Sequence, residues 1–110
     1  MIKDRRVAVL IMGAGPTGLT LACDLARRKV SFRIIDKAPK YVAGSRGKGL
    51  QPRSLEVLDD LGVVDPVLAN GRFHLPFRGY DGATVLGNHD MHEGRVPTPD
   101  MPYAGPLIIP

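Results

Sequence analysis

The stretch VAVLIMGAGPTG, residues Val7–Gly18, decides the fold of this chain because an apolar run leads directly into a cluster of glycines. The run Val7–Met12 holds six apolar residues, which is the length of a short strand buried on both faces. Strands of that kind belong to parallel sheets whose two faces are covered by helices. The stretch therefore predicts a parallel strand followed by a sharp turn.

Three glycines after this strand have the spacing G-x-G-x-x-G, and each has a separate physical role. Gly13 permits the turn out of the strand, Gly15 lets the backbone approach a pyrophosphate, and Gly18 lets the next helix pack closely on the sheet. The predicted helix begins at Pro16 and Thr17 and ends near residue 28. Its N-terminal N–H groups and the positive end of its dipole would face the pyrophosphate.

A second strand, Val30–Ile35, is predicted to follow and to end in Asp36. A carboxylate there, about twenty residues past the glycines, accepts hydrogen bonds from ribose hydroxyls and repels a 2′-phosphate. The unit therefore favours FAD or NAD over NADP. A glycine-rich turn that binds nothing is the alternative, but strand, glycines, helix, second strand and acid occur here in the required order. The helix is expected to turn four residues toward the sheet: Leu19, Ala22, Cys23 and Ala26.

The composition is that of a globular chain of single-domain length, with 110 residues of which 44% are hydrophobic. One β-α-β unit is too little for a complete dinucleotide-binding sheet, so we expect an incomplete domain. The net charge of +4 comes from scattered basic residues without interleaved aromatic residues, which argues against a nucleic-acid partner. No apolar stretch has the length of a membrane span, so we predict a soluble, cytoplasmic protein without a membrane partner.

The few metal-ligating side chains do not indicate a metal site. Cys23 is the single cysteine, so it is predicted to be a small residue on the helix rather than a reactive thiol. His89 and His92 stand near Asp90 and Glu93 in a polar, proline-rich segment, where such side chains are usually solvated. No metal is therefore expected.

The rest of the chain is predicted to contain two short helices and the start of an antiparallel sheet. Leu55, Leu58 and Leu61 share one face of a helix from Pro52 to Leu61, which Gly62 ends. A second helical turn has Asp65 as its N-cap, Pro66 just inside it and Gly71 after it. Residues 73–80 and 83–86 resemble strands joined by an Asp81-Gly82 turn, residues 88–103 a loop, and residues 107–109 a further strand. The fold class is thus α/β, with a Rossmann-like unit and the following helices in residues 1–72 and the beginning of a substrate-side sheet in residues 73–110.

Three segments make the chain resemble the N-terminal, FAD-binding part of the class A FAD-dependent aromatic monooxygenases. This family includes para-hydroxybenzoate hydroxylase, phenol hydroxylase and the hydroxylases of aromatic polyketides. The segments are VLIMGAGPTGL from Val9, IIDK from Ile34 and, most specifically, SRGKGLQPRSLE from Ser45. The resemblance runs over essentially the whole chain.

The resemblance implies a role for particular residues. The glycines would contact the FAD pyrophosphate, Asp36 the adenosine ribose, and Lys37 would flank the adenine. Arg46 would reach the phosphate and ribityl region, because the fixed fork of a guanidinium suits phosphate oxygens. Arg53 would add a further cofactor contact or, alternatively, pair with Glu56 at the start of its helix.

The sequence departs from the family at two points. Lys29 stands where many relatives place a glycine, so a non-glycine residue is expected in a left-handed conformation at the helix end. The second FAD-binding motif of the family, its Asp-Gly motif and its flavin-contacting glutamine are not found in the 110 residues. Catalytic residues therefore stay unassigned.

By resemblance, the reaction uses NAD(P)H as co-substrate to reduce FAD, after which O2 supplies the hydroxyl group for a small aromatic substrate. Two alternatives remain open: the NAD-binding unit of a dehydrogenase or reductase, and a non-catalytic truncated fragment. A fragment of this kind would associate with further copies of itself to cover an exposed sheet edge. By itself the 110-residue chain is expected to be inactive.

Overall fold

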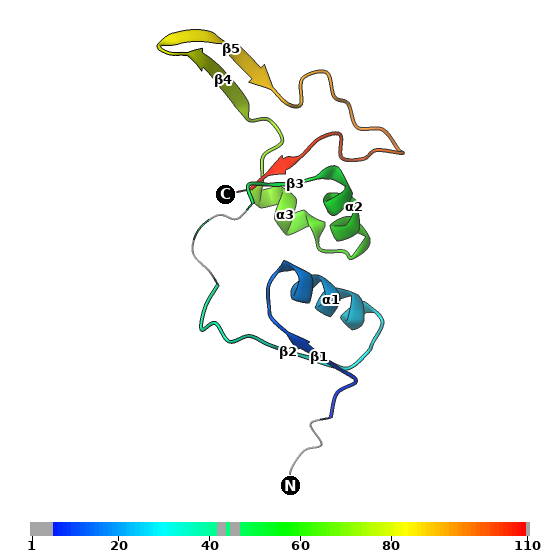
Figure 1. Cartoon of the computed structure of the whole chain (residues 1–110). Helices are drawn as coiled ribbons and strands as arrows, with labels where there is room; N and C mark the ends of the chain where they lie inside the picture. The colour runs from blue at the N-terminus through cyan, green and yellow to red at the C-terminus, as the bar shows by residue number, and fades with distance from the viewer. Residues whose placement is uncertain (1–5, 42–43, 45–46, 110) are drawn as a thin grey trace. The chain divides into compact units, whose positions relative to one another are not determined.

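The computed structural model describes residues 6–41, 44 and 47–109, which form two compact units, Met1–Gly44 and Ser45–Pro110 (Figure 1). The first unit holds β1 (Val9–Met12), α1 (Pro16–Arg27) and β2 (Phe32–Ile35). The second holds β3 (Gly49–Leu50), α2 (Pro52–Asp60), α3 (Val64–Asn70), β4 (Pro76–Asp81), β5 (Thr84–Asp90) and β6 (Leu107–Ile108). The division predicted between residues 72 and 73 separates a cofactor-binding part from a substrate-side part. The two compact units do not test it, so it stays a prediction.

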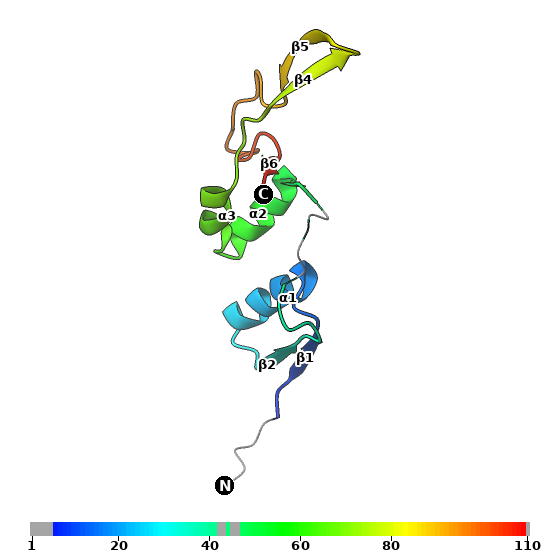
Figure 2. The ribbon, with the colours of Figure 1, turned by 90° about the vertical axis from the view of Figure 1, so that its left-hand side faces the viewer.

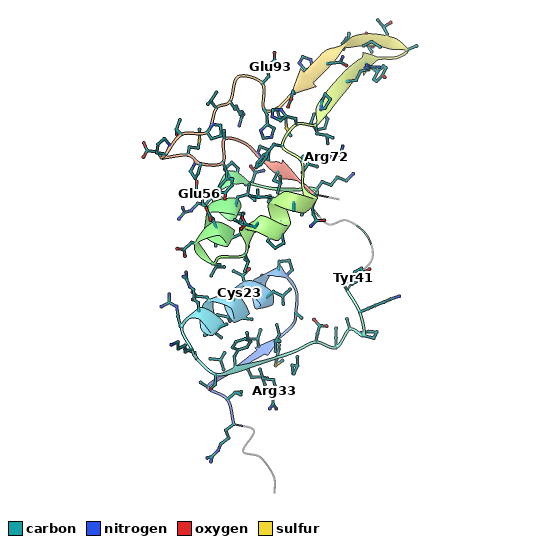
Figure 3. All side chains as sticks on the ribbon, turned by 180° about the vertical axis from the view of Figure 1, so that it is seen from behind. Cys23, Arg33, Tyr41, Glu56, Arg72 and Glu93 are labelled. Atoms are coloured by element: carbon teal, nitrogen blue, oxygen red, sulfur yellow. The ribbon has the colours of Figure 1, made fainter. Side chains whose placement is uncertain are left out.

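The first unit is the predicted β-α-β arrangement. β1 and β2 pair in parallel, with Val9 opposite Phe32 and Met12 opposite Ile35, and α1 connects them. Both strands are two residues shorter at their start than the apolar runs of the sequence. Side chains alternate along each strand, and α1 covers one face of the pair (Figures 1 and 2). The buried Ile11 lies on that face, since its Cγ2 would be 3.2 Å from a Cβ on Gly18 of α1. Figure 3 marks Arg33 on β2, where its side chain is exposed.

The helix face that packs on this sheet differs from the predicted one. Ala22 is buried and Cys23, marked in Figure 3, is partly buried, as expected. Leu19, however, keeps 50% of its surface exposed, and Ala26 is exposed as well. Gly18 and Leu25 take their places, since the buried stripe runs one residue earlier around the helix. The helical spacing of the sheet-facing residues was predicted correctly. Ala22 and Cys23 are confirmed, whereas Leu19 and Ala26 were predicted wrongly.

Two helices of the chain end in the same hydrogen-bonded motif. After α1, the N–H of Lys29 donates to Ala26 and that of Val30 to Leu25, both at 3.0 Å. These two bonds define a Schellman motif, in which the residue after the cap is left-handed. Lys29 has a φ of 58°, and it is the one non-glycine residue with positive φ among those described. The expectation drawn from the missing glycine is confirmed.

The end of α2 repeats this motif with a glycine at the equivalent position. The N–H of Gly62 donates to Asp59 at 2.8 Å and that of Val63 to Leu58 at 2.9 Å. Gly62 has a φ of 75°, which costs a glycine nothing. The predicted helix terminator is confirmed, and the two helix ends form a natural comparison between lysine and glycine.

The core of the second unit forms where α2 and α3 meet the pairing of β3 with β6. Leu55, Val64 and Leu107 are buried, and Leu58 packs against them as the predicted apolar face requires. β3 and β6 are antiparallel, with Leu50 opposite Leu107. The short apolar run at residues 107–109 thus enters a strand, as predicted.

Several boundaries in the second unit differ from the sequence prediction, including the start of β4, which is at Pro76 instead of residue 73. α3 begins at Val64 with Val63 as its N-cap, so Asp65 lies inside the first turn, where its charge suits the helix dipole. β5 runs on to Asp90, because the pairing with β4 continues into the segment predicted as a loop. There the Nε of Arg78 donates to the Oδ1 of Asn88 at 2.9 Å across the hairpin.

The hairpin is confirmed in the described part of the chain, but its turn lies one residue later than the predicted Asp81-Gly82 turn. Asp81 pairs with Thr84, so Gly82 and Ala83 form a two-residue turn. Gly82 has a φ of 58°, as the first central residue of a type II′ turn requires. None of the helices in the described ranges is long and apolar enough to cross a membrane.

The comparison of the two helix ends predicts opposite effects of reciprocal substitutions. Lys29→Gly should raise the free energy of unfolding of the first unit by about 1 kcal/mol, because glycine adopts positive φ without the cost of a Cβ. Gly62→Lys should lower that of the second unit by a similar amount. Urea denaturation followed through assigned amide NMR signals of each unit measures both. Lys29→Ala is the control, since it keeps the strain and should leave stability unchanged.

The approach of Gly71 to Leu107 predicts a non-additive pair of substitutions. A Cβ on Gly71 would lie 2.5 Å from Cγ of Leu107 and 2.8 Å from Cδ1. Gly71→Ala should therefore cost about 1–3 kcal/mol by overpacking, and Leu107→Ala about 2–5 kcal/mol by leaving a cavity. The double variant should be more stable than the sum of the two losses, because Leu107→Ala removes the atoms that collide. Strict additivity in urea denaturation would contradict this packing.

Candidate functional site

The candidate site is the turn between β1 and α1, which lies where the two parallel strands end. The N–H of Gly13 donates to the carbonyl oxygen of Ile35 at 2.7 Å, so the start of the turn is bound to the last residue of β2. The register explains this closeness, because Met12 stands opposite Ile35. Ligands of parallel α/β sheets bind at this carboxyl edge.

The three glycines differ in whether the chain itself allows a side chain at their positions. Gly13 has a φ of 113°, which side chains rarely allow. A Cβ on Gly18 would collide with the carbonyl oxygen of Gly13 and lie 3.2 Å from Cγ2 of Ile11. Gly15 has an ordinary extended backbone with a φ of −77°, and a Cβ there would meet no described atom within 4 Å. The chain itself therefore does not require a glycine at position 15, whereas a ligand that approaches the backbone would.

The N-terminus of α1 supplies hydrogen-bond donors to the same place. Gly15 is the N-cap and Pro16 is the first helical residue, so the N–H groups that open the helix begin with Thr17. Among the residues that the structure describes, no side chain caps this end, and its first turn holds no acidic residue. The side chain of Thr20 instead donates to the carbonyl oxygen of Pro16 at 2.7 Å. A helix N-terminus without a side-chain cap is the arrangement that binds phosphate groups in nucleotide-binding proteins.

Asp36 joins the end of β2 to the turn. Its Oδ2 accepts a hydrogen bond from the N–H of Ala14, and its Oδ1 accepts one from the N–H of Ala38, both at 2.7 Å. The bond from Ala14, then that from Ala38 and the charge of Lys37 lower the pKa of Asp36 from its ordinary value of 3.8. The side chain is therefore an ionised carboxylate at neutral pH. The sequence did not indicate the two donors, since a backbone N–H leaves no mark in the residue type.

The remaining predicted site residues are Lys37, Arg46 and Arg53. Lys37 follows Asp36 and is exposed. Arg46 lies outside the described residues. Arg53 belongs to α2 in the second unit, where its Nη1 donates to Oε2 of Glu56 at 2.6 Å. This is the pairing that the sequence offered as the alternative to a cofactor contact, and a cofactor contact of Arg53 stays a prediction. Figure 3 labels Glu56.

A β-α-β unit with this glycine turn and terminal carboxylate defines the class of dinucleotide-binding proteins. Comparison with known proteins identifies the family. Residues 6–97 match the family of the FAD binding domain. The chain belongs to this family, in which the FAD-binding domains of flavin-dependent monooxygenases are found.

Individual relatives agree with this assignment. The chain is 46% identical to a flavin-dependent monooxygenase of Mycobacteroides abscessus over 108 residues, which cover 94% of the chain and 23% of the relative. It is 42% identical to a 6-methylpretetramide 4-monooxygenase of Streptomyces rimosus over 90 residues, 82% of the chain and 16% of the relative. Its fold matches the flavin-dependent monooxygenase PieE, solved with FAD and substrate, with a TM-score of 0.71 and 26% identity over 97% of the chain and 20% of that protein. The chain thus spans about a fifth of the length of these relatives.

The different reasons for the three glycines predict three different effects of alanine on stability. Gly15→Ala should change the free energy of unfolding by less than about 1 kcal/mol, because the extended backbone suits alanine but alanine is a poorer N-cap residue than glycine. Gly13→Ala should lower it by about 1–2 kcal/mol through the positive φ. Gly18→Ala should lower it by about 1–3 kcal/mol, because the helix must move off the turn. Urea denaturation without ligand measures all three, and a loss for Gly15→Ala as large as that for Gly18→Ala would contradict the open space at position 15.

Proposed function

We propose that this chain binds the ADP half of FAD for a monooxygenase that hydroxylates a small aromatic substrate with NAD(P)H and O2. The observation that carries the proposal is Gly15. Its conformation and surroundings allow a side chain, yet the residue stands between a left-handed glycine and an uncapped helix N-terminus. A pyrophosphate bound there accounts for the glycine, because a Cβ would occupy the approach to the backbone.

The residues of the turn have distinct roles in this proposal. Gly13, Gly15 and Gly18 shape the turn, while Pro16 and Thr17 open the helix whose N–H groups face the pyrophosphate. Their donors and the helix dipole offset negative charge without a bound metal ion.

Four further side chains complete the assignment. The Asp36 carboxylate accepts hydrogen bonds from the adenosine ribose, and Lys37 lies beside the adenine. Arg46 and Arg53 are assigned to the phosphate and flavin side of the cofactor on the family resemblance. A carboxylate at position 36 also disfavours a 2′-phosphate, which supports FAD over NADP at this site.

Bound FAD would supply the redox chemistry, whereas the residues of this chain bind and orient the cofactor. The reductant, NADH or NADPH, and the aromatic substrate are proposed from the resemblance to aromatic hydroxylases. Several features of the whole protein belong to the same proposal: a Rossmann-type sheet, a cytoplasmic location, and no nucleic-acid or membrane partner. Self-association is included, because a two-stranded sheet leaves strand edges that a second copy can pair.

A titration of FAD with the purified chain tests the proposal through the fluorescence anisotropy of the flavin. The chain contains 0 Trp residues, so its own emission interferes little. Saturable binding is expected, with competition by ADP but not by FMN, since ADP shares the half of FAD that the turn holds. Gly15→Ala should weaken binding by roughly 10- to 100-fold, as expected for the loss of one hydrogen bond to a charged group.

The control for this titration is Gly79→Ala in β4 of the second unit, where the φ is not positive and an added Cβ would lie 3.8 Å from Cβ of Leu86. It should leave the dissociation constant of FAD unchanged. Competition by FMN instead of ADP, or equal affinity of Gly15→Ala and the original chain, would contradict the assignment of the turn to the ADP half. No binding at about 1 mM chain would contradict the proposal that these residues hold FAD by themselves.

A further inference from the structure

The Asp36 carboxylate accepts two hydrogen bonds from backbone N–H groups of the chain itself. One carboxylate oxygen accepts from Ala14 inside the glycine turn, and the other accepts from Ala38, two residues further along the chain. The side chain thereby connects the glycine turn to the segment after β2, since Ala14 and Asp36 are 22 residues apart.

The turn needs a hydrogen bond to a distant residue because its glycines give the backbone a wide choice of conformations. Ala14 stands between Gly13 and Gly15, and glycine loses more conformational freedom on folding than any other residue. The bond from Gly13 to Ile35 fixes the start of the turn, and the helix fixes its end at Gly15. The Oδ2 of Asp36 holds the peptide between these two points.

We propose that Asp36 is a positioning residue that fixes the glycine turn in its ligand-binding shape before a cofactor arrives. The ligand part of this inference rests on the proposed function, whereas the effect on the turn does not. A preformed turn binds more tightly, because the entropy of ordering it is not lost on binding. The role is additional to a contact with the adenosine ribose.

One carboxylate has the capacity for both tasks. An ionised carboxylate offers about four acceptor positions, and the bonds from Ala14 and Ala38 use two of them. Bonds from N–H groups to a charged oxygen are also about twice as strong as neutral ones. The remaining positions can accept from ribose hydroxyls while the turn stays held.

The chemistry of the side chain defines sharp variants. Asparagine has the shape of aspartate but only one acceptor oxygen, so Asp36→Asn must lose one of the two bonds and place an amide N–H group against a backbone N–H. Asp36→Ala loses both. Asp24→Asn is the matched control, since Asp24 lies near the other end of α1 and accepts from Arg27 at 2.6 Å and Arg28 at 3.0 Å.

The experiment measures hydrogen exchange of the Ala14 amide in the chain without cofactor. We expect Asp36→Ala to accelerate this exchange by about tenfold or more, as for the loss of a bond to a charged acceptor, and Asp36→Asn to accelerate it as well. Asp24→Asn should leave it unchanged. The Ile11 amide in β1 reports whether the unit is still folded and should exchange as in the original chain.

A pH titration of the original chain tests the same bond without any substitution. The lowered pKa of Asp36 means that the ionised carboxylate holds the turn above the ordinary value of 3.8, and that the hold is lost as the pH falls through the lower folded-state value. The Ala14 amide proton shift should therefore titrate below pH 3.8, together with the Asp36 carboxyl signal. A shift of Ala14 that does not follow Asp36 would overturn the inference.

The outcomes separate this inference from the proposed function. Unchanged Ala14 exchange in both Asp36 variants, with weaker FAD binding, would overturn the positioning role and leave a ribose contact. Faster Ala14 exchange in a chain that does not bind FAD would support the positioning role and contradict the proposed function. Faster exchange with FAD affinity equal to that of the original chain would overturn the link between a preformed turn and binding.

Discussion

The parallel pairing of β1 with β2 is the constraint on which the candidate site depends. Because Met12 stands opposite Ile35, Gly13 and Asp36 leave the sheet side by side. The bonds from Gly13 to Ile35 and from Ala14 to Asp36 both follow from this register. A slip by one residue would turn the apolar side chains to the wrong face and also move the carboxylate away from the turn.

The sequence predicted those parts of the fold in which a residue type has a direct physical consequence. The turn at Gly13, the hairpin and the helix end at Gly62 were predicted correctly, because each depends on a backbone angle that glycine permits, although the hairpin turn lies one residue later than predicted. The same reasoning predicted a left-handed backbone at Lys29, a non-glycine residue, and the observed φ of 58° confirms it. Local chemistry of this kind does not depend on distant residues.

The parts that were predicted wrongly depend on tertiary contacts. Leu19 and Ala26 have helical spacing, but so have Gly18 and Leu25, and only the sheet decides which stripe is buried. The extension of β5 to Asp90 follows from pairing with β4, which overrides the polar composition of that segment. Likewise, the bond from Ala14 to Asp36 joins a backbone group to a distant side chain, so no sequence pattern could indicate it.

The carboxylate at the edge of the turn also bears on the electrostatics of binding. A pyrophosphate and an aspartate repel each other, so a carboxylate beside an anion site requires compensation. The N–H groups of Ala14 and Ala38 supply part of it, since they bind the charge of Asp36 and lower its pKa. The N-terminus of α1, without an acidic residue in its first turn, supplies the rest on the side of the pyrophosphate. In the proposed complex with FAD, the turn would keep a negative charge that favours a ribose hydroxyl over a phosphate and would still attract the pyrophosphate.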